Sequence, residues 1–341
     1  MAKRKRRPQR DKRKSPTIAP WPVMSGLTDA KSLLAQHRYA QAISVLENLN
    51  ERYPDRVDVL SVLAEAYREG SSLANYLTTC LDLQKLMPDD PETTLALAEA
   101  YLWNVYLFSA LRTYHHFAER WSDQVDVTEV QRRIKDLEAQ TQKTLASEGF
   151  PEETGREVAL MHEEIQVLLA QSKFRESREL AEKLLEIQPD FVPALNNVSQ
   201  NYFMEGERER AIQAAGRVLD LEPDNHHALA NLTRYLYLSG RVDQAKQMAG
   251  RLKAAESERS DIWIKKAEAL SFLGDDEGVL NAFQGAEQTG VLDGPFTDPF
   301  LYHLAAVAAM RLDQADRARG YWESLDFQSI QALSSNGPIS S

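Results

Sequence analysis

Histidines and carboxylates are the side chains of this sequence that could do chemistry, as metal ligands or as general acids and bases. There are seven histidines, including the adjacent pairs His115-His116 and His226-His227. A metal site on one helix needs ligands three or four residues apart, and adjacent residues are expected to point to different sides of a helix. The His-Glu-Glu sequence at residues 162–164 lacks the second histidine of a helical zinc-protease motif. We therefore expect no metal site.

Catalytic motifs are also missing from the sequence. It contains no Walker-type phosphate loop, no Gly-rich dinucleotide fingerprint and no nucleophile elbow. With 51 Asp and Glu in 341 residues, close carboxylate pairs such as Asp275-Asp276 are inevitable and do not indicate catalysis. The single cysteine, Cys80, excludes an internal disulfide and a cysteine metal cluster, and its apolar neighbours suggest a small core residue. The prediction is a protein that is not an enzyme and holds no cofactor.

The elements that carry these side chains repeat with a fixed period between Val158 and about Thr289. Residues spaced 34 apart include Ser172, Gly206, Gly240 and Gly274, and also Leu168, Tyr202, Leu236 and Leu270. A fixed period of this length predicts stacked helix–turn–helix pairs. One such pair cannot bury its apolar face alone, so neighbours must stack into a solenoid with a concave and a convex side.

The unit from Val192 to Asn225 shows the pattern most clearly, and it resembles a tetratricopeptide repeat. That motif has a large apolar residue at its fourth position, a small one at its eighth and an aromatic or Leu at its eleventh. Gly follows at the fifteenth, Ala at the twentieth and Pro at the thirty-second. Leu195, Ser199, Tyr202, Gly206, Ala211 and Pro223 occupy these places. The resemblance implies an all-α fold, a right-handed α-α superhelical solenoid of roughly eight helix hairpins.

The organisation of the rest of the chain follows from prolines, glycines and changes of repeat frame. We expect a disordered basic arm at 1–26, three repeats at 27–124, a long helix and joint at 125–157, four repeats at 158–290, a loop at 291–298, a capping repeat at 299–327 and a disordered tail at 328–341. The turn of the third repeat has Asn104-Val105 where glycine is usual. We therefore expect that hairpin to be tighter or irregular.

The resemblance further implies that the concave face is the working surface, a non-catalytic scaffold or adaptor that binds a segment of a partner protein. The concave positions are held by Asn196, Asn197, Gln200, Phe203, His227, Asn231, Arg234, Tyr237 and Lys265. Asn197 and Asn231 fall at the sixth position, where the family often uses Asn to grip a peptide backbone. An amide suits this task because it offers a donor and an acceptor together. The alternative is that these are solvated polar positions of ordinary helices.

The charge of the chain is divided between a basic arm and an acidic body. Residues 1–14 hold one Asp and nine basic residues: Lys3, Arg4, Lys5, Arg6, Arg7, Arg10, Lys12, Arg13 and Lys14. With a net charge of −11 for the whole chain, the arm carries +8 and the remainder −19. Three interpretations stay open: an anchor for RNA or DNA, a localisation or ribosome-docking tag, or a solubilising tail that folds back on the acidic body.

No apolar run approaches the roughly 18–20 residues needed to cross a bilayer, and the N-terminus lacks the apolar core of a secretory signal. We therefore expect a soluble, cytoplasmic protein without a membrane partner.

Overall fold

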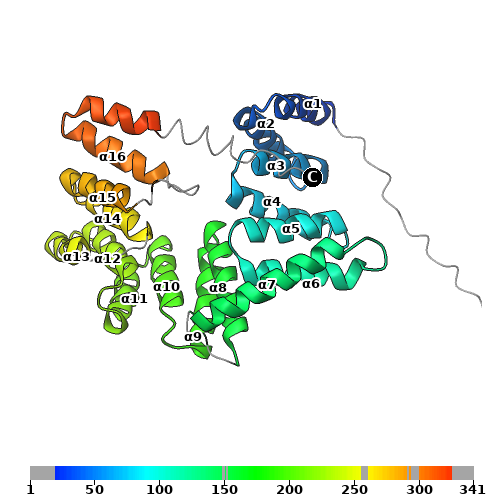
Figure 1. The fold of residues 1–341 in the computed structure, drawn as a ribbon. Helices are drawn as coiled ribbons and strands as arrows, with labels where there is room; N and C mark the ends of the chain where they lie inside the picture. The colour runs from blue at the N-terminus through cyan, green and yellow to red at the C-terminus, as the bar shows by residue number, and fades with distance from the viewer. Residues whose placement is uncertain are drawn as a thin grey trace, which may run out of the picture. The chain divides into compact units, whose positions relative to one another are not determined.

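The computed structural model describes residues 20–147, 150, 153–254, 260–289, 292 and 299–324. Over these residues the chain consists of helices joined by short turns and contains no strand (Figure 1). Consecutive helices pack as antiparallel hairpins, and successive hairpins pack on one another within each compact unit of the chain. The expected all-α solenoid is confirmed.

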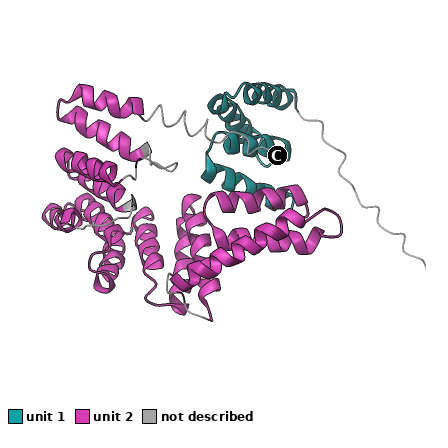
Figure 2. Cartoon of the chain, in the orientation of Figure 1, with its two compact units in different colours: residues 1–88 teal, residues 89–341 magenta. Residues whose placement is uncertain are grey.

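The chain forms two compact units, residues 1–88 and 89–341 (Figure 2). The first holds two hairpins, built from α1 (Trp21–Ala35), α2 (Tyr39–Arg52), α3 (Val57–Glu69) and α4 (Leu73–Leu86). Helix α1 begins inside the segment expected to be a disordered arm, so residues 21–26 are helical and that part of the prediction is wrong. The reason is local: Pro22 lies in the first turn, where proline is pre-organised for a helix, and Val23 is buried.

The second unit holds the remaining helices. They are α5 (Pro91–Trp103), α6 (Leu107–Trp121), α7 (Thr128–Ser147), α8 (Gly155–Ala170), α9 (Phe174–Ile187), α10 (Val192–Met204), α11 (Arg208–Leu221), α12 (His226–Leu238), α13 (Val242–Ala254), α14 (Ser260–Phe272), α15 (Asp276–Gln288), α16 (Pro299–Arg311) and a last helix at residues 315–324. The joint that the sequence indicated at 125–157 lies inside this unit. The expected tail at 328–341 and all of the loop at 291–298 except Leu292 fall outside the described residues.

The hairpin turns share one backbone conformation. A residue with positive φ stands between the two helices at His37, Ser71, Val105, Ser172, Gly206, Gly240, Gly274 and Asp313, with φ between 56° and 83°. The turn at Asn104-Val105 therefore has the same left-handed geometry as the glycine turns, and the expectation of a tighter or irregular hairpin is wrong. The packing of the two helices imposes φ +62° on Val105, although a β-branched residue disfavours that region.

Close approach of the two helices in each hairpin depends on a short side chain near the start of the second helix. Ser177, Ala211, Ala245 and Val279, spaced 34 apart, are all 0 % exposed.

Side-chain hydrogen bonds connect successive repeats. Arg217 Nη2 donates to the carbonyl of Pro189 at 2.9 Å, and Arg251, at the same position of the next repeat, donates in the same way to Pro223.

A buried carboxylate joins α8 to α6, next to the long helix α7 that packs on α6. Glu163 is 7 % exposed, and its two carboxylate oxygens accept hydrogen bonds from the backbone N–H groups of Phe108 (3.0 Å) and Ser109 (2.7 Å). These groups belong to the first turn of α6, which has no intrahelical acceptor for them. Burial raises the pKa of Glu163, while the hydrogen bonds from Ser109 and Phe108 oppose that shift. The carboxylate thus caps one helix from another.

The turn geometry makes a prediction about stability. Val105→Gly should raise the free energy of unfolding by about 1 kcal/mol, because glycine removes the steric cost of positive φ but loses more entropy on folding. Gly206→Val should lower it by a similar amount, since no atom lies within 4 Å of a Cβ built there and only the φ of +83° is unfavourable. Urea denaturation of both variants measures the two effects; a destabilised Val105→Gly protein would contradict the account.

Candidate functional site

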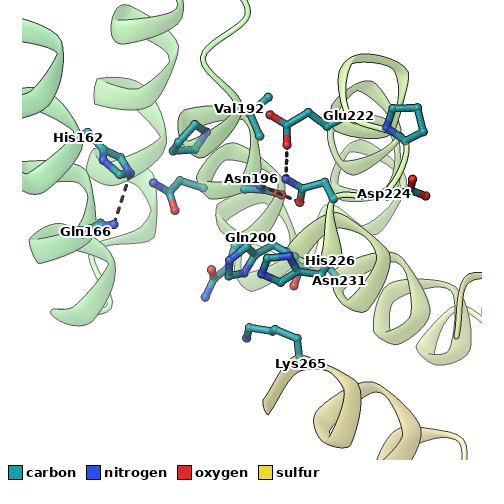
Figure 3. Close-up of a pocket in the computed structure, with 15 residues that line it drawn as sticks. His162, Gln166, Val192, Asn196, Gln200, Glu222, Asp224, His226, Asn231 and Lys265 are labelled. Atoms are coloured by element: carbon teal, nitrogen blue, oxygen red, sulfur yellow. Dashed lines mark hydrogen bonds between the residues drawn. The ribbon is translucent and has the colours of Figure 1, made fainter. Parts of the chain in front are cut away.

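A groove of about 1060 Å³ runs along the first helices of four consecutive repeats, α8, α10, α12 and α14, and the loop that precedes α12 (Figure 3). Its lining is polar, with six amides, three imidazoles, three charged side chains and three apolar ones. These are Gln166, Asn196, Asn197, Gln200, Asn225 and Asn231; His162, His226 and His227; Glu222, Asp224 and Lys265; and Val192, Pro193 and Pro223. We call this the amide groove.

Six of the nine residues that the sequence placed on the concave face line the amide groove. They are Asn196, Asn197, Gln200, His227, Asn231 and Lys265. The other three lie away from its lining. Phe203 stacks on Tyr235 with ring centroids 4.3 Å apart, and Tyr237 is 37 % exposed.

Arg234, the third of these, is held by its neighbours. Its guanidinium lies over the ring of Phe203, 5.0 Å from the centroid, and its Nη1 is 3.3 Å from Glu268 Oε1. The other oxygen of Glu268 accepts a hydrogen bond from Lys265 Nζ at 2.9 Å. The two cations therefore share one carboxylate, and Arg234 stabilises the contact between α12 and α14.

The orientation of the groove amides is fixed by the N-cap of α12. The backbone N–H of Ala228 donates to Asn225 Oδ1 at 2.9 Å, so the other end of that amide, Nδ2, donates to Glu222 at 2.7 Å. Asn225 Oδ1 also accepts from Asn196 Nδ2 at 3.4 Å. Asn196 must consequently turn its own oxygen away from the cap.

Two amide atoms under the groove surface have no hydrogen-bond partner among the described residues. They are Asn196 Oδ1, an acceptor, and Asn197 Nδ2, a donor. A buried polar group without a partner costs about 1–3 kcal/mol. This cost is not confined to the groove, since Asn201 Oδ1 and Arg234 Nε also lack a partner among the described residues and lie outside its lining.

Sequence reasoning missed the part of the groove that α8 contributes. His162 and Gln166 precede Asn196 and Gln200 by one repeat period, so extending the concave positions back by one repeat would have found them. The ring of His162 packs edge-on against Phe191, with centroids 5.4 Å apart. Burial lowers the pKa of His162 to about 4, so its imidazole is neutral near pH 7.

The sequence predicted that the adjacent histidines of α12 point to different sides of the helix, and this prediction is wrong. Their ring centroids are 4.3 Å apart, and both rings line the amide groove. His226 is the first residue of α12, where the helix has no preceding turn to direct the side chain. Within the described residues, no group of three or more His, Cys, Asp or Glu could hold a metal ion.

The nine basic residues of the arm, from Lys3 to Lys14, lie outside the described residues. Among the helices that the structure describes, none combines the length and the apolar character that crossing a membrane requires.

Comparison with known proteins gives one family match, a model described as tetratricopeptide repeat, over residues 202–269. No curated protein matches the sequence. A tetratricopeptide repeat protein from Parabacteroides merdae is similar in structure at 10% identity, over 85% of this chain and 99% of that one, with a TM-score of 0.39. The yeast Sti1 TPR2AB domain in a pHSP90 complex is also similar in structure, at 13% identity over 79% of this chain and 98% of that one, with a TM-score of 0.30. The human IFIT1 dimer with m7Gppp-AAAA is similar at 14% identity, over 90% of this chain and 72% of that one, with a TM-score of 0.36. None of these likenesses assigns a partner to this chain.

The lowered pKa of His162 predicts a stability change with pH. Between its unfolded pKa of 6.5 and its folded pKa of about 4, the unfolded chain binds the extra proton, so stability falls as the pH is lowered through this window. Between pH 6.5 and pH 4.5, the wild type should lose about 2 kcal/mol more than His162→Gln, in which the titrating group is absent. Denaturant titrations at both pH values measure this difference, and equal losses would refute it.

Proposed function

We propose that this chain, which matches a tetratricopeptide repeat model over residues 202–269, binds an extended segment of a partner protein in its amide groove. The chain then acts as a non-catalytic scaffold. The observation that carries the proposal is the concentration of amide side chains from α8, α10 and α12, and the loop between α11 and α12, around one hollow.

Amides suit a peptide backbone for a chemical reason. Each peptide group presents one N–H donor and one C=O acceptor, and each Asn or Gln side chain offers the complementary pair. A peptide in the groove can therefore be held through its main chain. Within the described residues, Asn196 has no partner at its oxygen and Asn197 has none at its nitrogen, so a side-chain rotation that exposes these two buried atoms would offer one acceptor and one donor to the peptide.

The character of the groove favours a peptide over a small molecule. Small-molecule sites are mostly apolar and measure about 300–1,000 Å³. The amide groove is as large as the upper end of that range, at about 1060 Å³, but only Val192, Pro193 and Pro223 of its fifteen lining residues are apolar. A ligand that gains little from apolar burial must be held by many hydrogen bonds, and an extended backbone supplies them in a row.

Replacing two groove amides separates binding from folding. The double variant Asn197→Ala with Asn231→Ala should bind peptides selected from a displayed library of random 12-residue sequences about thirtyfold more weakly than the full-length wild type, because each of the two lost hydrogen bonds costs about 1 kcal/mol. Its thermal stability should rise, since alanine is the better helix former and the unpartnered Asn197 Nδ2 is removed. Fluorescence anisotropy and calorimetry measure the two quantities.

A matched control uses exposed asparagines of other helices. Asn48→Ala with Asn281→Ala should gain helix stability in the same way, and it should leave peptide affinity unchanged. A library that yields no binder, or binders that the groove variant holds as tightly as the wild type, would overturn the proposed function.

A further inference from the structure

The two ends of the amide groove differ in charge. Glu222 and Asp224 belong to the loop between α11 and α12, whereas Lys265 lies on α14, and Figure 3 shows the labelled amides Asn196 and Gln200 between Glu222 and Lys265. A peptide held along the amides would therefore meet different electrostatic surroundings at its two ends.

At the acidic end, no described side chain forms an ion pair with either carboxylate. Glu222 and Asp224 are both exposed, and neither forms an ion pair within the described part of the chain. The hydrogen bond that Glu222 accepts comes from a neutral group, the Asn225 amide, at 2.7 Å. Two carboxylates thus line the groove without a cationic partner in the part of the chain that the structure describes.

The cationic end, by contrast, is already paired. Lys265 Nζ lies 2.9 Å from Glu268 Oε2, and the same carboxylate also contacts Arg234. His162 adds no charge near pH 7, because burial lowers its pKa to about 4. Of the Asp, Glu, Lys and Arg side chains that line the groove, only Glu222 and Asp224 have no ion-pair partner among the described residues, and both belong to the loop that His226 and His227 follow.

We propose that the amide groove selects an extended peptide segment that carries a Lys or Arg side chain opposite Glu222 and Asp224. This inference rests on the proposed peptide-binding function and adds its specificity. The amides hold the main chain, which is the same in every peptide, so they cannot distinguish one sequence from another. The charge complementarity of the two carboxylates supplies the discrimination.

Lysine and arginine suit this position because of their length. Their flexible stems let the charged group reach an exposed rim while the backbone stays in the groove. Since the carboxylates are exposed, each ion pair contributes little, about 0.2–1 kcal/mol, and it is weakened by salt. Peptides with a basic residue should therefore bind several-fold more tightly than peptides without one, and this difference should be largest at low ionic strength.

The test uses the full-length protein and the peptides selected from the random 12-residue library. In Glu222→Gln with Asp224→Asn, affinity for peptides with a basic residue should fall about fivefold at low salt and less at high salt. The matched control, Glu186→Gln with Asp243→Asn, removes two exposed carboxylates outside the groove and should leave affinity unchanged.

Charge reversal identifies the contact. Library selection on Glu222→Lys with Asp224→Lys should enrich Asp or Glu in place of the basic residue. Selected peptides without a basic preference, or a loss of affinity equal to that of the control, would overturn the specificity inference. If those same peptides still depend on Asn197 and Asn231, the groove function stands; if they do not, both proposals fail.

Discussion

One residue in the left-handed conformation at each hairpin turn is the constraint on which the rest of the structure depends. It recurs once in every repeat from Ser172 to Gly274, with φ between 58° and 83°. It reverses the direction of the chain, so that the second helix packs antiparallel to the first. The first helices of successive repeats consequently lie side by side. Side chains at the same repeat position, such as Gln166 and Gln200, then line one groove although they are distant in sequence.

The polar lining of that groove has an energetic cost that the repeats must offset. Within the described residues, Asn196 and Asn197 keep amide atoms without partners, and Glu222 and Asp224 keep charges without cations. The apolar contacts of each hairpin and the hydrogen bonds between repeats supply the opposing stability, so the scaffold tolerates a costly surface. A site that weakens the protein in which it stands is expected where binding, and not packing, determines the residue types.

The sequence is informative about the groove to the extent that the repeat period determines position. The period predicts the helix hairpins. The family resemblance names six residues that line the amide groove, and extending its concave positions back by one repeat also reaches His162 and Gln166. It does not determine side-chain conformation or pairing: Arg234 was expected in the groove, but Glu268 and Phe203 hold it elsewhere. The loop that contributes Glu222 and Asp224 lies outside the concave positions, so no periodic signal indicates it. The left-handed turn at Val105 was missed because the packing of the two helices, and not the residue type, imposes it.

The central claim is that the groove amides hold the main chain of a peptide. A crystal structure of the full-length protein with a library-selected peptide tests it most directly. The account predicts an extended peptide between α8, α10 and α12, whose backbone N–H and C=O groups hydrogen-bond to the side chains of Asn197 and Asn231. A peptide bound on the outer face of the solenoid, or one held in the groove without main-chain contacts to these amides, would contradict it.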